Sequence, residues 1–398
     1  MKLYRPTAQL KIALTGRCTN DCAICFNDTR RRDNASRTDL PMALIRDAIT
    51  AAAELGLSGV YWTGGEPLLR YSDMVELTRH AKSLGLPASM VTNAAPLGAY
   101  GAYREKNEAL LREAGTWDLS PRQMVEELRD AGLTRVFLSI DNSHNTDQDP
   151  ERAPANRVPT SVVARALDAL LDGGFGQRSA EEFIGHRLRI SVTGNGEWRG
   201  PSERMLADVL KTTGLVEEAP RRFSDSRGSV QIKFLETASV GAALVLPSRL
   251  LEKRSGKGLF GIRCGNMEKR AEAYDGGRHH QDLSINHEGT VSLCGNFMYP
   301  IGRVQETSLD EMVSDVNRGS SSGTHATTVA VLHRLFRIAD EHGASAIGEA
   351  FRILHDEDPE LLGGLSTEGG ACHALGRDAE LGKRFVDAFD RRSLTLDG

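Results

Sequence analysis

The chain has 398 residues, of which 40% are hydrophobic and 26% are charged, and its formal net charge is −5 at pH 7. Such a chain is long enough for a globular main domain and a smaller second one. Its net negative charge argues against a nucleic acid held through its phosphates, and no segment approaches the roughly 20 apolar residues of a membrane span. We therefore expect a cytoplasmic protein that binds neither nucleic acid nor membrane.

Strands and helices are expected to alternate over the first 240 residues. The first strand, "LKIALT", precedes a helix in "DLPMALIRDAITAAAELGL", where Asp39 is the expected cap and Gly56 the expected stop. Further strands are expected in "VYWT", "ASMVTN", "RVFLSID", "RLRISVTG" and "VQIKFLE", each with a helix before it. Six strands joined by helical crossovers predict a parallel sheet covered by helices.

Three of the six cysteines, Cys18, Cys22 and Cys25, lie close together just after the first expected strand. In a reducing compartment, clustered thiols are more often metal ligands or catalytic groups than disulfides. A structural zinc site needs a fourth ligand, and the next histidine is His80 and the next cysteine Cys264. Three thiolates suit a 4Fe-4S cluster with one iron open to a small molecule. Zinc and unrelated buried cysteines are the alternatives.

The segment "CTNDCAIC" has the CxxxCxxC form of the radical S-adenosylmethionine (radical SAM) enzymes and follows the first strand, as it does in that family. Gly64, Gly65, Glu66 and Pro67, in "VYWTGGEPLL", are similar to the family's GGEP segment, which contacts the methionine amino group. The chain departs from the family at Ile24, where an aromatic residue is common. The resemblance implies a SAM-binding 4Fe-4S cluster on the three cysteines, S-adenosylmethionine, and a partial, TIM-like (β/α)6 barrel.

In parallel barrels the chemistry collects at the carboxyl ends of the strands. Four polar residues lie there, Thr92 and Asn93 at the end of the third expected strand and Ser139 and Asp141 at the end of the fourth. By their position in the family's barrel, we expect them to contact the methionine or ribose part of S-adenosylmethionine. The alternative is that they form turns and caps, as such residues do at any strand end.

Two long connections are expected on the same side of the barrel. They are "PLGAYGAYREKNEALLREAGTWD" and the polar segment "NSHNTDQDPERAPANRVP". Both are longer than a crossover needs, so each is interpreted either as a lid over substrate or as a surface insertion.

The remaining cysteines, Cys264, Cys294 and Cys372, follow the sixth expected strand. "HEGTVSLCGNFMYPIGRVQETSLDEM" is similar to the SPASM and Twitch auxiliary-cluster domains of radical SAM proteins, and "GGACHALGRDAELGKRF" resembles their closing end. Two-cluster SPASM domains have seven cysteines, so three imply the smaller Twitch form with a second, auxiliary 4Fe-4S cluster. We expect a radical SAM core at 1–240 and a Twitch-like domain with a helical end at 241–398. Alternatively, one of these cysteines donates a hydrogen atom.

The resemblance implies an oxidoreductase that cleaves S-adenosylmethionine reductively and abstracts a substrate hydrogen atom with the 5′-deoxyadenosyl radical. A flavodoxin or ferredoxin would be its external electron donor. The first strand starts near Leu10, which leaves no room for the amino-terminal peptide-binding domain of many relatives. A small natural-product intermediate (sugar, aminocyclitol or nucleoside) is therefore the expected substrate. Alternatives are crosslinking or epimerisation of a ribosomal peptide, a redox-neutral epimerase with a cysteine hydrogen donor, a non-enzymatic iron–sulfur carrier, and a zinc-binding interaction domain.

Overall fold

The computed structural model describes residues 9–22, 25, 39–177, 187–193, 199–235, 282–293, 299–319, 325–331, 333–334, 380–384 and 386–387. Six strands run parallel, each beside the next along the chain, and they confirm the six expected strands. They are β1 (Leu10–Thr15), β2 (Val60–Gly64), β3 (Ala88–Thr92), β4 (Leu133–Asp141), β7 (Arg187–Thr193) and β10 (Ser229–Leu235).

Further strands extend both edges of this parallel sheet. Beside β1 lie β11 (Leu283–Ile285), β12 (Thr290–Leu293) and β13 (Tyr299–Arg303), and beside β10 lie β9 (Arg222–Ser224) and β8 (Val216–Ala219). β11 is parallel to β1, and the other added strands pair antiparallel to their neighbours. The eleven strands form one sheet with the order β13-β12-β11-β1-β2-β3-β4-β7-β10-β9-β8.

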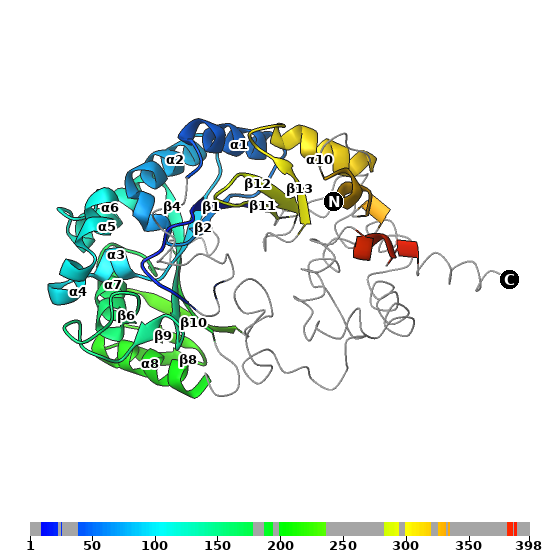
Figure 1. Ribbon diagram of the computed structural model, residues 1–398. Coiled ribbons are helices and arrows are strands. Elements are labelled where there is room, and N and C mark those ends of the chain that lie inside the picture. Colours follow the sequence, from blue (N-terminus) through cyan, green and yellow to red (C-terminus); the bar gives the residue numbers. More distant parts are fainter. Residues whose placement is uncertain are drawn as a thin grey trace.

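Five helices link the parallel strands and cover one face of the sheet. They are α1 (Met42–Glu54), α2 (Tyr71–Ser83), α6 (Pro121–Ala131), α7 (Thr160–Asp172) and α8 (Arg199–Thr212). Figure 1 shows them as an arc outside the curved sheet. Alternate strand residues, such as Trp62, Met90 and Ile140, are fully buried toward these helices. Their sequence neighbours therefore lie on the inner face of the curve.

Helix α6 begins with a side-chain cap, whereas α1 does not. Ser120 and Gln123 form a capping box at α6, with Pro121 in the first turn. At α1 the capping position is held by Pro41 without a side-chain hydrogen bond, so the expectation for Asp39 is wrong. The Asp39 carboxylate instead pairs with Arg17 at 3.2 Å. Gly56, with φ of +74°, follows α1 as the expected left-handed stop.

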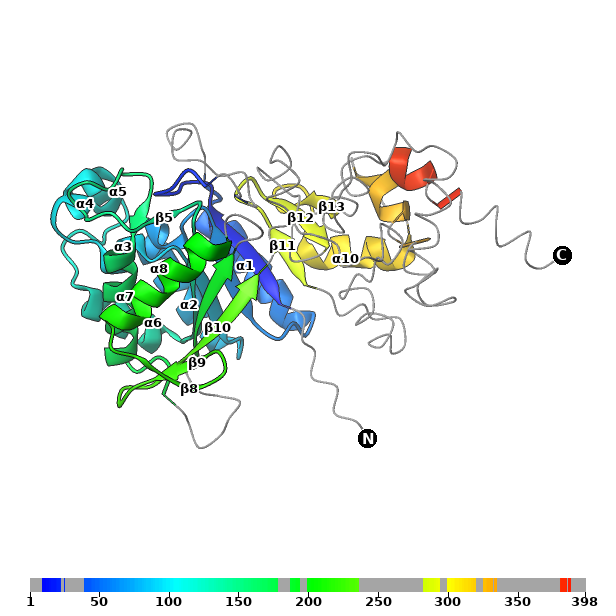
Figure 2. The same ribbon diagram turned by 90° about the horizontal axis from the view of Figure 1, so that it is seen from below.

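The two long connections are folded rather than loose. The first contains α3 (Ala95–Gly98), α4 (Gly101–Lys106) and α5 (Glu108–Glu113), and the second contains the paired strands β5 (Asn145–Thr146) and β6 (Val158–Pro159). Lys106 ties them together, because its Nζ donates to the carbonyls of Pro150, Glu151 and Ala153 at 3.1, 2.7 and 2.9 Å. In Figure 2 α4, α5 and β5 lie at one side of the molecule and the β8–β9 hairpin at the other.

Within 241–398, the described elements include β11–β13 and α10 (Leu309–Arg318). β11 pairs directly with β1, so β11–β13 continue the main sheet. α10 lies near α1 and continues the layer of helices. A separate Twitch-like domain at 241–398 stays a prediction. Among the helices of the described ranges, none combines the length and apolar character that crossing a bilayer requires.

Candidate active site

The three clustered cysteines follow β1 directly, at the carboxyl end of the strand. Cys18 is 6% exposed, and the backbone N–H of Cys25 donates to the carbonyl of Cys22 at 3.1 Å. Burial raises the pKa of the Cys18 thiol, and the negative charge of Glu66 raises it further. Burial and the charge of Asp141 likewise raise the pKa of Cys22. A nearby cation, such as the irons of a cluster, would reverse this and favour the thiolates.

Gly64 and Gly65 let the end of β2 lie against the cysteine loop. Gly65 N donates to the carbonyl of Thr15, and Glu66 N to that of Arg17, both at 2.8 Å. A Cβ on Gly65 would lie 1.9 Å from the Arg17 carbonyl oxygen, and Gly64 has a φ of +129°. Both positions therefore require glycine for packing, and this contact brings Glu66 beside the cysteines.

Glu66 is a fully buried carboxylate held by three neutral donors. Its Oε1 accepts from Leu68 N at 3.1 Å and from Thr92 Oγ1 at 2.9 Å, and its Oε2 accepts from Asn93 N at 2.9 Å. Burial raises the pKa of Glu66 to about 7, although these hydrogen bonds and the charge of His144 act in the opposite direction. No lysine, arginine or histidine of the described ranges forms an ion pair with it. Such a carboxylate is suited to a cation that the described residues do not supply.

Asn93 connects the end of β3 to the cysteine loop. Its Nδ2 donates to Thr19 Oγ1 at 2.9 Å and lies 3.8 Å from the Cys18 sulfur, while its Oδ1 accepts from Ala95 N. The residue after it, Ala94, has a φ of +71°, which is unusual for a residue with a side chain. The structure therefore brings together the predicted residues of β2, β3 and the cysteine loop. Pro67 begins the short 3-10 helix η2 (Pro67–Arg70) directly after Glu66.

At the end of β4, Asp141 already has a cationic partner. Its Oδ2 lies 2.6 Å from His144 Nδ1, and Nε2 of the same ring lies 2.9 Å from the carbonyl oxygen of Ser139. Burial lowers the pKa of His144, but the charge and hydrogen bond of Asp141 outweigh it, and the net direction is upward. Since a carboxylate and a carbonyl both accept, this arrangement favours a proton on each ring nitrogen, and therefore the charged imidazole. Cofactor contacts for Ser139 and Asp141 remain predictions.

Sequence reasoning missed several residues around this site. His144 was part of a connection interpreted as a lid or insertion, although a histidine three residues after a strand-end Asp141 was an available signal. Asn20, inside the cysteine motif, donates to the His144 carbonyl at 3.4 Å. Arg70 donates to the carbonyls of Leu14 and Leu40 at 3.0 and 2.9 Å, which fixes the end of β1. No local pattern marks that arginine.

The described donor set fits an iron–sulfur cluster better than a single ion. In the residues that the structure describes, no three His, Cys, Asp or Glu side chains converge where one metal ion could sit. A 4Fe-4S cluster makes a different demand, because each thiolate binds its own iron. Cys18, Cys22 and Cys25 are neighbouring thiols whose charges interact, and they could hold such a cluster.

The predicted auxiliary ligands lie outside the described residues. This holds for Cys264, Cys294 and Cys372, so their cluster remains a prediction. Their nearest described neighbour is Leu293, where β12 ends directly before Cys294.

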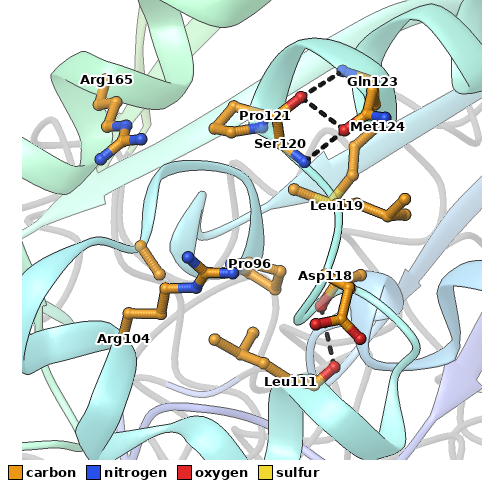
Figure 3. Close-up of a pocket in the computed structure, with 12 residues that line it drawn as sticks. Pro96, Arg104, Leu111, Asp118, Leu119, Ser120, Pro121, Gln123, Met124 and Arg165 are labelled. Atoms are coloured by element: carbon orange, nitrogen blue, oxygen red, sulfur yellow. Dashed lines mark hydrogen bonds between the residues drawn. The ribbon is translucent and has the colours of Figure 1, made fainter.

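A cavity of about 300 Å³ lies between the first long connection and helices α6 and α7. Figure 3 shows Arg104, Arg165 and Asp118 around it, together with apolar side chains. Arg104 stabilises the fold of the first long connection. Its guanidinium donates to the carbonyl of Trp117 and lies 4.5 Å from the centre of the Trp117 ring. The cavity is lined by none of the predicted site residues.

Fold and site together define an α/β protein with a three-cysteine loop at the carboxyl end of its first parallel strand. Residues 12–181 match the family model described as the Radical SAM superfamily. This range contains the three cysteines and the GGEP segment. Over these residues the chain carries a Radical SAM domain, and proteins with this domain bind a 4Fe-4S cluster and S-adenosylmethionine.

Two kinds of curated protein are similar to parts of the chain. The PqqA peptide cyclase of Xanthomonas euvesicatoria pv. vesicatoria is 25% identical over 252 residues, which cover 56% of this chain and 59% of that protein. A probable GTP 3′,8-cyclase of Methanothermobacter marburgensis is 34% identical over 140 residues, covering 34% of this chain and 36% of the relative. The chain thus spans little more than half the length of the peptide cyclases that it matches.

Two solved structures have a more distant similarity. SuiB of Streptococcus suis bound to S-adenosylmethionine has a TM-score of 0.41 at 15% identity, over 86% of this chain and 76% of that one. The enzyme anSMEcpe with bound AdoMet also has a TM-score of 0.41, at 14% identity, over 77% of this chain and 80% of that one. Similarities of this size add nothing to the assignment.

Proposed function

We propose that this radical SAM enzyme holds its cluster on Cys18, Cys22 and Cys25 and binds S-adenosylmethionine against Glu66. The observation that carries the proposal is the buried Glu66 carboxylate, which has three neutral donors and no described cation partner. An ammonium group is the complement of such a carboxylate. When bound, the cluster would supply the electron that cleaves S-adenosylmethionine to the 5′-deoxyadenosyl radical.

The chain's own residues would orient these groups. Asn93 links the end of β3 to Thr19 and Cys18, so the cysteine loop and the Glu66 carboxylate are held in one hydrogen-bonded unit. The Asp141–His144 pair supports the same loop from β4 through Asn20. Such a unit would fix the cofactor's ammonium group while keeping water away from the carboxylate.

The substrate we infer is a peptide. The support is the similarity to proteins named PqqA peptide cyclases over 56% of the chain, which favours the peptide alternative over the small natural-product intermediate. A crosslink between two residues removes two hydrogen atoms from the peptide, one as an atom and one as a proton with an electron for an acceptor. An auxiliary cluster on Cys264, Cys294 and Cys372 would be such an acceptor, and this would make the enzyme an oxidoreductase.

Anaerobic reconstitution tests the proposal. The wild-type protein should hold about eight irons per chain, from two four-iron clusters, and should form 5′-deoxyadenosine with dithionite. Alanine at Cys18 should remove half of the iron and all cleavage, whereas alanine at Cys294 should remove the other half. Stoichiometric zinc without iron would contradict the proposal. About four irons, with cleavage intact, would contradict the auxiliary cluster alone.

A further inference from the structure

Three arginines gather on the inner face of the sheet, away from the cysteine loop. The register of β4 and β7 places Arg135 opposite Arg187 and Phe137 opposite Arg189. The alternate residues of both strands, such as Val136 and Ile190, are buried toward the helices. The arginine side chains therefore lie on the face that Figure 1 shows turned inward by the curve of the sheet. We call Arg135, Arg187 and Arg189 the arginine group.

Two members of the arginine group, Arg135 and Arg189, are half-buried cations with no acidic partner among the described residues. Burial lowers the pKa of Arg135, and the charges of Arg187 and Arg189 lower it further. Burial also lowers the pKa of Arg189. In the described ranges no carboxylate pairs with Arg135 or Arg189, whereas Arg227 on the outside of the sheet has three acidic partners. Like charges on neighbouring paired strands repel, so an anion bound beside Arg135 and Arg189 would be stabilised there.

The two side chains that the Arg189 guanidinium contacts, Phe137 and Gln231, are neutral. Its guanidinium lies 5.1 Å from the centre of the Phe137 ring and donates to Gln231 Oε1 at 3.1 Å. The Phe137 ring lies 5.6 Å from that of Tyr61, and Lys11 lies over the Tyr61 ring at 5.8 Å. Positive charge above an aromatic surface matches a ligand with an acidic group on a mainly apolar body.

We propose that the arginine group binds a carboxylate of the peptide substrate. A guanidinium offers paired N–H donors that match the two oxygens of a carboxylate, and these charge-assisted bonds are the strong ones. The ligand's charge would also offset the repulsion between Arg135 and Arg189. This inference rests on the proposed function and adds that the substrate peptide carries an acidic residue.

The position of Arg189 along β7 indicates how far the acidic residue lies from the reacting carbon. Arg189 is four residues before Thr193, where β7 ends beside Asp141. At about 3.3 Å per residue, the arginine lies roughly 13 Å below the carboxyl end of the strand. An extended peptide covers that distance in about four residues. A peptide anchored by its acidic residue could therefore present a carbon at the strand ends, beside the cysteine loop.

Calorimetric titration of the reconstituted, full-length protein tests the arginine group. The probes are acetyl-Ala-Glu-Ala-Glu-Ala-amide, its glutamine counterpart, and citrate. The wild-type protein should bind the glutamate peptide at least tenfold more tightly than the glutamine peptide. Arg135→Gln and Arg189→Gln should each remove most of this preference, and Arg189→Lys should restore part of it. Arg122→Gln, on the exposed face of α6, is the matched control and should keep the full preference.

Several outcomes would overturn the inference. One is equal binding of both peptides to wild-type protein, and another is an unchanged preference in folded Arg135→Gln and Arg189→Gln, with folding checked by thermal melting and iron content. Arginine-dependent binding of citrate without binding of the glutamate peptide would reject the peptide and assign a free acid. Failure of the proposed function looks different, because wild-type protein with a loaded cluster would then form no 5′-deoxyadenosine, whatever the peptides do.

Discussion

Two buried carboxylates at strand ends of this barrel have opposite surroundings. Glu66, after β2, accepts from two backbone N–H groups and one hydroxyl, and no described cation pairs with it. Asp141, at the end of β4, lies 2.6 Å from a histidine nitrogen and accepts from two backbone N–H groups as well. Both side chains are acidic and nearly inaccessible to solvent.

The difference separates a buried carboxylate with no described cation partner from one that already has such a partner in the fold. A buried carboxylate without a cation lowers the stability of the folded protein, and a ligand that supplies the cation offsets this loss. The Asp141 carboxylate already has its cation in His144, so a ligand's ammonium group would gain less there. Position at a strand end is therefore not enough to assign a residue to cofactor binding. The partners of its charge decide the assignment.

The largest expected effect is on stability, at Asp141. Asp141→Asn removes one partner of a buried ion pair and leaves the His144 charge without compensation, which should cost about 3–5 kcal/mol in the free energy of unfolding. Anaerobic urea unfolding measures it. Asp130→Asn, an exposed pair on α6, is the control and should cost less than about 0.5 kcal/mol. A loss below about 1 kcal/mol at Asp141 would remove the contrast between the two carboxylates.

Glu66 should behave in the opposite way. Glu66→Gln removes the charge that would hold an ammonium group, so S-adenosylmethionine should bind about tenfold more weakly or worse, as measured by equilibrium dialysis. Iron content should not change. Glu76→Gln on the exposed face of α2 is the matched control. Unaltered affinity in the Glu66 variant would show that this carboxylate does not contact the ligand.

Binding should also depend on pH. The pKa of Glu66 is raised to about 7, so below that value the carboxyl group is mostly neutral. S-adenosylmethionine affinity should therefore fall about tenfold for each pH unit below about 7 and level off above it. Glu66→Gln should show no such slope. A wild-type profile that is flat between pH 6 and about 8 would contradict the assignment.

The stability of the ligand-free protein should change with pH in the opposite direction to S-adenosylmethionine binding. Because the folded-state pKa of Glu66 lies above its ordinary value of about 4.3, the folded state favours the neutral form. This contribution to stability is complete below about pH 4.3 and is lost as the pH rises through about 7. Free protein should therefore lose stability over the range in which S-adenosylmethionine binding improves.

The smallest expected effect is at Thr92. Thr92→Val removes the hydroxyl that donates to Glu66 Oε1 at 2.9 Å, a hydrogen bond worth about 0.5–1.5 kcal/mol. The pKa of Glu66 should rise by about half a unit to one unit, and the midpoint of the binding profile should move upward equally. Thr134→Val, whose hydroxyl donates to the Ala88 carbonyl away from Glu66, should leave the midpoint unchanged.

The six parallel strands and the neighbourhood of Glu66 were predictable from sequence. Runs of β-branched, aromatic and other apolar residues such as "RVFLSID", each after an expected helix, predict parallel strands, and the cysteine and GGEP motifs have specific spacings. The reason for Gly65 was not predictable, because it depends on a carbonyl 48 residues earlier, at Arg17. The roles of Asp39 and His144 depend on partners brought by tertiary packing. The arginine group likewise exists only through the register of β4 and β7.

The pairing of β11 with β1 links the cysteine-bearing strand to a segment far along the chain. The two strands are joined by hydrogen bonds between Gln9 and residues 282 and 283, across a separation of 273 residues. During synthesis the free edge of β1 therefore stays open until the last third of the chain has emerged. Contacts this distant in sequence slow folding, and an open hydrophobic edge invites aggregation. Truncation before Leu283 should therefore yield insoluble protein, because it leaves this edge of β1 without its partner strand.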